Sequence, residues 1–187
     1  DLGKLKEAEL STRKAIELNS NYADAHLNLG SILKDLDKLK EAEQSTRKAI
    51  ELNPNEAKCY SNLGSILKDL GKLKEAEVYI LKAIQLNPDL TIAYFSFSTF
   101  KLSEKNKIWR DKLFSKNLLN KKSTEDIVNI YFARANILHK ESNFKESTKY
   151  LQLANNYKKN IDPTDFLLEK SKELMLETNN EIVNEDK

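Results

Sequence analysis

Residues 19–52 read NSNYADAHLNLGSILKDLDKLKEAEQSTRKAIEL, and residues 53–86 read NPNEAKCYSNLGSILKDLGKLKEAEVYILKAIQL. The two stretches are both 34 residues long and are identical at 22 positions. The chain opens with half of the same unit, because residues 1–18 match residues 35–52 at 16 of 18 positions. A repeat of this length that contains two helical segments is typical of a solenoid built from stacked helix pairs.

Apolar residues recur at helical spacing in both halves of each unit. The first half of the 19–52 unit carries Leu29, Ile32, Leu33 and Leu36, and the second half carries Leu39, Ala42, Ala49, Ile50 and Leu52. One such helix pair cannot bury its apolar face alone, so neighbouring units must supply the core.

Small and turn-forming residues also repeat with the unit. Gly30 and Gly64 have no side chain, so we expect two helices to approach closely there. Asp37-Lys38 and Gly71-Lys72 are expected to form the tight turn between the helices. Pro54 and Pro88 disfavour helix in the residue before them and predict the end of the second helix, with Asn55 and Asp89 as N-caps of the next.

The 34-residue period and its residues resemble the tetratricopeptide repeat family. The matching positions are Gly30 and Gly64, Ala42 and Ala76, Ala49 and Ala83, and Pro54 and Pro88. The resemblance implies an all-α fold, a right-handed superhelical solenoid of antiparallel helix pairs. Such solenoids use their concave surface for binding.

The chain is predicted to contain six segments. Residues 1–18 form the second helix of a truncated repeat, 19–52 and 53–86 are full repeats, and 87–124 is a degenerate unit with a linker. Residues 125–160 form a divergent repeat, opened by a capping box at Ser123 and Asp126. Residues 161–187 are predicted to be a capping helix with a frayed tail.

Composition narrows the class of protein. The 187 residues carry a net charge of only +2, which gives no basic field for nucleic acid. Four glycines and three prolines are too few to punctuate an all-β fold. Cys59 has no cysteine partner. The run LTIAYFSFSTF at residues 90–100 is too short to span a bilayer, so we expect no membrane association and a cytoplasmic protein. The low arginine content against high lysine and abundant asparagine suggests a bacterial source.

No motif in the sequence predicts catalysis, a metal or a cofactor. Gly71-Lys72 lacks the upstream glycine of a phosphate loop. His26 and His139 have no second ligand at metal spacing. The Lys–Glu blocks beginning at Lys38 and Lys72 are expected to be solvated helix faces with pairs three or four residues apart. We therefore expect no enzyme activity in these 187 residues and no cofactor.

The predicted binding surface is the concave groove lined by the first helix of each unit. Its candidate residues are Asp24, Leu27, Asn28, Ser31, Lys34, Lys58, Asn62, Ser65 and Lys68. Asn28 and Asn62 lie 34 residues apart, so they should form a ladder whose amides can pair with an extended peptide backbone. This arrangement resembles the asparagine ladder of the O-GlcNAc transferase family. A peptide-carboxylate clamp is disfavoured, because Leu27 and Ser31 stand where that clamp has lysine and asparagine.

The second half carries a narrower resemblance to the repeat region that precedes the catalytic domain of bacterial tetratricopeptide–sulfotransferase proteins. It rests on Phe132-Ala133, on Ala154-Asn155 and on Ile108-Trp109 before them. The chain contains no loop of the kind with which that family binds its phosphosulfate donor. The resemblance implies that this chain could be a recognition arm joined to a C-terminal catalytic domain of the same polypeptide.

Three functions follow from these observations. The first is an interaction module that binds a protein or an extended peptide segment in its groove. The second is the substrate-recognition arm of a larger transferase, a sulfotransferase first and an O-GlcNAc-transferase-like enzyme second. The third is a structural scaffold or oligomerisation element.

Overall fold

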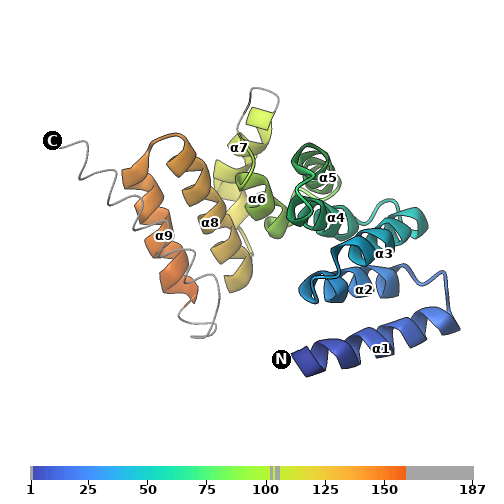
Figure 1. The fold of residues 1–187 in the computed structure, drawn as a ribbon. Helices are drawn as coiled ribbons and strands as arrows, with labels where there is room; N and C mark the ends of the chain where they lie inside the picture. The colour runs from blue at the N-terminus through green and yellow to red at the C-terminus, as the bar shows by residue number, and fades with distance from the viewer. Residues whose placement is uncertain (1, 102, 104–105, 159–187) are drawn as a thin grey trace. The chain divides into compact units, whose positions relative to one another are not determined.

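The computed structural model describes residues 2–101, 103 and 106–158 (Figure 1). This part of the chain is all-helical and contains no strand, which confirms the predicted fold class. The α-helices are α1 Leu2–Leu18, α2 Ala23–Asp35, α3 Leu39–Leu52, α4 Ala57–Asp69, α5 Leu73–Leu86, α6 Thr91–Ser98, α7 Lys107–Phe114, α8 Thr124–Lys140 and α9 Phe144–Lys158, with a 3-10 turn, η2, at Lys116–Leu119. The chain divides into two compact units, residues 1–93 and 94–187. The predicted capping helix at 161–187 lies outside the described residues.

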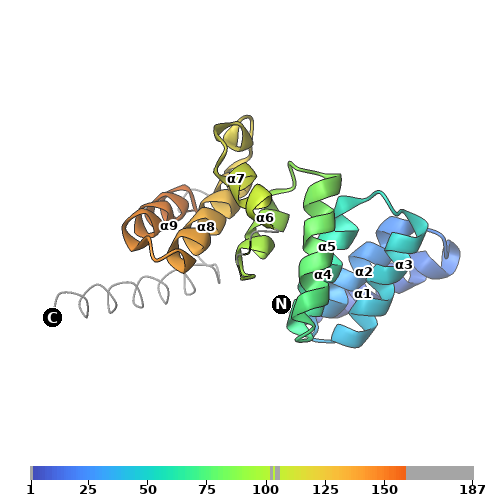
Figure 2. The ribbon, with the colours of Figure 1, turned by 90° about the horizontal axis from the view of Figure 1, so that it is seen from above.

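In the first unit, helices pair and then stack (Figure 2). The helix α2 packs against α3, and α4 packs against α5, as two antiparallel hairpins. The hairpins join because α3 packs on α4 and α2 also touches α4, while α1 packs on α2. The apolar stripes read from the sequence form this core, since Leu29, Leu33, Ala42 and Ile66 are buried together.

The turn between the paired helices has the same geometry in both hairpins. The amides of Asp37 and Lys38 donate to the carbonyls of Lys34 and Leu33, at 2.9 and 2.8 Å. The Gly71 turn repeats both bonds one unit later. This pattern is the Schellman motif, which places its central residue in the left-handed region. Asp37 has φ 58° and Gly71 has φ 75°.

Gly30 and Gly64 lie where the two helices of a hairpin touch, as predicted. A Cβ atom on Gly30 would overlap the hydroxyl of Thr46 and lie 3.3 Å from the carbonyl oxygen of Ala42. A Cβ atom on Gly64 would lie 2.6 Å from the Ile80 side chain. Glycine is therefore needed at both positions because of the close approach of helices that the sequence indicated.

Charged residues of the Lys–Glu blocks form ion pairs between neighbouring repeats. Arg47 on α3 bonds Glu43 on its own helix at 2.8 Å and Glu75 on α5 at 2.5 Å. Lys72, in the turn before α5, reaches back to Glu43 at 2.8 Å. The expectation of purely local pairs on solvated faces was therefore wrong. It failed because two of these three pairs join residues 28 and 29 positions apart, across the junction of neighbouring repeats.

The four equivalent residues form the same network one repeat earlier. Arg13 bonds Glu9 at 2.9 Å and Glu41 at 2.8 Å, and Lys38 bonds Glu9 at 2.9 Å. We call the α1–α3 junction seam 1 and the α3–α5 junction seam 2.

The second unit contains one full hairpin, made of α8 and α9. Its turn repeats the Schellman bonds, with Ser142 at φ 57°. Ala135 takes the glycine position and is fully buried, and the Ser147 hydroxyl donates to its carbonyl at 3.0 Å. The predicted capping box is present, since the side chains of Ser123 and Asp126 each accept from the other residue's amide. These contacts place the predicted divergent repeat on a regular helical hairpin.

The stretch that was expected to be a degenerate repeat is built from shorter helices. The helices α6 and α7 have 8 residues each, against 13 and 14 for α4 and α5. Arg134 on α8 is buried and donates to the carbonyls of Leu113 and Ser115, at 2.9 and 3.0 Å. These two bonds satisfy carbonyls at the C-terminal end of α7, which its own helix leaves without partners.

Both predicted helix caps were wrong, since α6 begins at Thr91 and Asp89 is not the residue before it. The N-cap of α4 is Glu56, whose carboxylate accepts from the amide of Lys58 at 3.0 Å, rather than Asn55. The helix begins one residue later than expected because the turn after Pro54 takes one more residue.

Candidate interaction surface

The nine predicted groove residues all lie on α2 and α4. On α2, Asp24 and Asn28 are exposed, while Leu27, Ser31 and Lys34 are half-buried. On α4, Lys58 is exposed and Asn62, Ser65 and Lys68 are half-buried. The two helices touch, so the structure brings these residues to two adjacent helices of one unit.

The two asparagines of the predicted ladder differ in their surroundings. Asn62 donates through Nδ2 to the Ser31 hydroxyl at 3.1 Å and to that of Thr46 at 3.4 Å. It therefore ties α4 to α2 and α3. No hydrogen bond to the Asn28 amide is found within the described residues, and this side chain faces solvent.

The groups that could carry other chemistry are held in structural contacts. The Nε2 atom of His26 lies 3.0 Å from the carbonyl of Ser20, and His139 packs edge-on to Phe144. Cys59 is buried, and burial, together with the charges of Glu56 and Asp24, raises the pKa of its thiol to about 11. A thiol with this pKa is a poor nucleophile at neutral pH.

The described residues include no group of three or more His, Cys, Asp or Glu side chains that could hold a metal ion. None of the helices in this part of the chain has the length and apolar character needed to cross a membrane.

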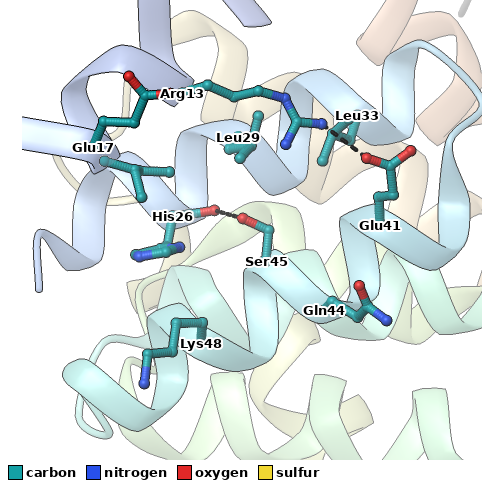
Figure 3. A pocket seen from close by; sticks show the side chains of 10 residues that line it. Arg13, Glu17, His26, Leu29, Leu33, Glu41, Gln44, Ser45 and Lys48 are labelled. Atoms are coloured by element: carbon teal, nitrogen blue, oxygen red, sulfur yellow. Dashed lines mark hydrogen bonds and ion pairs between the residues drawn. The ribbon is translucent and has the colours of Figure 1, made fainter. Parts of the chain in front are cut away.

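Seam 1 carries an open cleft that the sequence analysis did not find (Figure 3). It has a volume of about 410 Å³ and lies between α1, α2 and α3. Leu29, Leu33 and Ile16 give it an apolar part, and charged side chains, including Arg13 and Glu41, lie at its edge. The sequence carries a signal for this cleft, since Ser45 against Tyr79 is one of the twelve differences between the two repeats.

A comparison with family models bears on the repeats directly. The tetratricopeptide repeat model matches the chain twice, at residues 23–56 and 57–90. Residues 23–56 and 57–90 are tetratricopeptide repeats. These matches have the predicted period and begin four residues later than the units 19–52 and 53–86. Tetratricopeptide repeats generally serve as non-catalytic modules for protein interaction.

Solved structures of tetratricopeptide proteins share the fold. Pseudomonas aeruginosa PilF matches with a TM-score of 0.66 and 21% identity, covering 98% of this chain and 79% of its own. A chain of the APC/C hetero-tetramer Cut9–Hcn1 matches with a TM-score of 0.78 and 13% identity, covering 96% and 34%. YrrB, described as a TPR protein with an unusual peptide-binding site, matches with a TM-score of 0.55 and 23% identity, covering 78% and 74%. At these identities the likeness establishes the fold. No curated protein sequence matches this chain significantly.

Proposed function

We propose that this chain is an interaction module that binds an extended peptide segment of a partner protein along the exposed side of α2 and α4. The observation that carries the proposal is the Asn28 side chain, which is exposed at the centre of the predicted groove residues of α2. A free primary amide offers donors and an acceptor together, which is what a peptide backbone needs from a partner.

The neighbouring residues support an extended peptide as the ligand. Asp24 and Lys58 are exposed near the N-terminal ends of α2 and α4, and Lys34 and Lys68 are half-exposed near their C-terminal ends. Hydrogen bonds to the peptide backbone give affinity for many peptide sequences, and charged residues around the backbone contact add a preference for some peptide side chains. The fold shared with YrrB, whose description names a peptide-binding site, agrees with this class of ligand.

The two asparagines of the predicted ladder must be tested separately. Replacing both would change peptide binding and stability together, because Asn62 links two repeats and its loss removes hydrogen bonds worth about 1 kcal/mol of stability. Asn28 has no such bond among the described residues, so Asn28→Ala should not lower the stability.

The experiment begins with a displayed library of random peptides selected on the whole chain. A selected peptide should bind Asn28→Ala about tenfold more weakly than the wild type, since a hydrogen-bonding group at an interface contributes about 1–2 kcal/mol. Asn21→Ala is the matched control, an exposed asparagine of the loop before α2 that should bind normally. Equal affinity for Asn28→Ala and the wild type would refute Asn28 as a backbone reader.

The alternative function is that of a recognition arm in a larger transferase. Its support is the resemblance at Phe132-Ala133 and Ala154-Asn155, on α8 and α9. Phe132, Ala133 and Ala154 are buried in the hairpin core, so packing alone explains three of these four residues. The reading frame beyond Lys187 tests this alternative, because a donor-binding domain there would support it.

A further inference from the structure

The cleft at seam 1 has a filled counterpart at seam 2. Of the ten residues that line the cleft, seven recur unchanged 34 positions later. The three that differ are His26, Gln44 and Ser45, which become Tyr60, Val78 and Tyr79. The two junctions therefore share most of their lining residues. They differ in that the Tyr79 ring lies at seam 2, where seam 1 has the cleft.

At seam 2 the ring of Tyr79 is held on two sides. It stacks on Tyr60 with ring centroids 6.1 Å apart and an angle of 30° between the planes. Arg47 donates from Nη1 to the Tyr79 hydroxyl at 2.8 Å, and its guanidinium lies 5.5 Å from the centre of the ring. Stacking and cation–π contacts of this kind each contribute stabilising energy beyond that of burying the ring.

Seam 1 keeps the arginine, has His26 in place of Tyr60, and lacks the tyrosine that these two groups hold at seam 2. Arg13 makes the same ion pairs as Arg47, through Nε and Nη2, and its Nη1 atom has no partner within the described residues. His26 takes the place of Tyr60 and is fixed in the same way, by a contact with the carbonyl of Ser20 where Tyr60 bonds that of Pro54. The Ser45 hydroxyl donates to the carbonyl of His26 at 2.9 Å (Figure 3).

We propose that this cleft binds a tyrosine side chain of a partner protein, with the ring against His26 and the hydroxyl accepting from Nη1 of Arg13. The site goes beyond the proposed function, because its lining comes from α1, α2 and α3 and shares no residue with the predicted groove. It would give the module a second anchor point.

The chemistry of the cleft favours tyrosine over other side chains. The apolar part formed by Leu29, Leu33 and Ile16 suits a ring rather than a charged group. Glu17 and Glu41 at the edge would repel a carboxylate or a phosphate, while Arg13 and Lys48 would repel a lysine. Phenylalanine would leave Nη1 of Arg13 covered and unpaired, which is costly for a charged donor.

The test uses the isotope-labelled whole chain and p-cresol, the tyrosine side-chain analogue, as the probe. In an NMR titration, p-cresol should shift the amide resonances of His26, Leu29 and Ser45. Toluene, which lacks the hydroxyl, should bind at least about tenfold more weakly, since a hydrogen bond to a charged group contributes that factor or more. Ser45→Tyr should fill the cleft from within and abolish these shifts.

Gln85→Tyr, an added tyrosine at an exposed position on α5, is the matched control and should leave p-cresol binding unchanged. The proposal is overturned if p-cresol leaves the cleft resonances unmoved, if toluene binds equally well, or if Ser45→Tyr still binds. Shifts of the same resonances with protein concentration alone would also overturn it, because the occupant would then be a second copy of this chain. The Asn28 experiment is independent of all these outcomes.

Discussion

At the residue scale, the glycines and alanines shared by the two repeats mark helix contacts, and one position where the repeats differ distinguishes the two seams. Gly30, Gly64 and the buried alanines are shared because two helices touch there. Ser45 and Tyr79 differ, and one junction is open where the other is filled.

The close approach at Gly30 predicts a coupled pair of substitutions. Gly30→Ala should destabilise the chain by about 1–2 kcal/mol, because a clash with Thr46 worth about 1–3 kcal/mol outweighs the higher helix propensity of alanine. Thermal or urea unfolding of Gly30→Ala, Thr46→Ala and the double variant measures the coupling. The double variant should be more stable than the sum of the single effects, and simple additivity would contradict a contact at this point.

The left-handed turn residue predicts a stabilising change. Asp37 has φ 58°, where the equivalent residue one repeat later is Gly71. Asp37→Gly should raise the free energy of unfolding by about 0.5–1 kcal/mol, because glycine adopts this conformation without steric cost. Asp35→Gly, in the last turn of α2, is the control and should be destabilising. A loss of stability in Asp37→Gly would contradict this prediction, because it would mean that side-chain interactions of Asp37 stabilise the fold by more than its left-handed backbone costs.

At the element scale, the two seams bind one helix pair to the next through buried apolar residues and a repeated ion network. Hydrogen bonds from Lys38 and Arg13 lower the pKa of Glu9. Burial of Glu43 opposes its ionisation, but the bonds from Lys72 and Arg47 outweigh burial and its pKa is also lowered. Both carboxylates therefore stabilise the folded state more when they are ionised than when they are protonated.

These lowered pKa values predict acid sensitivity. The stability contributed by Glu9 and Glu43 is fully present above the ordinary glutamate pKa of about 4.3, and it is lost as the pH falls through the lower folded-state values. Urea unfolding should therefore show a steeper loss of stability below about pH 4 in the wild type than in the Glu9→Gln, Glu43→Gln double variant. Glu7→Gln, at an exposed position on α1, should keep the wild-type slope. Equal slopes in all three proteins would show that the network does not stabilise the fold.

Much of the element-scale organisation could be predicted from the sequence, and the limits have physical causes. The period of 34 residues defined α2 to α5, because close copies must repeat the same helices and turns. It did not show that Lys38 and Lys72 reach the preceding helix, since sequence spacing displays only pairs within one helix. The period also did not show that α6 and α7 are short. Their sequence differs too much from the two near-identical repeats for the helix bounds to be carried over.

At the scale of the whole molecule, the two units relate differently to the sequence. Residues 1–93 contain the near-copies, and residues 94–187 contain a hairpin, α8–α9, with the same turn and the same buried small position at Ala135. The candidate site was predicted in part: the nine groove residues lie on α2 and α4, and their role in binding stays a prediction. The use of Asn62 as a link between repeats could not be foreseen, because its partner Ser31 belongs to the preceding copy.

An NMR map of the labelled chain bound to a peptide selected from the displayed library locates the peptide-binding surface residue by residue. If the peptide binds along α2 and α4, the largest shifts should fall at Asn28, Ser31 and Ser65, and the same peptide should shift them less in Asn28→Ala, which binds it more weakly. Shifts confined to α3 and α5, or to the cleft around His26 and Ser45, would contradict binding along the α2–α4 surface.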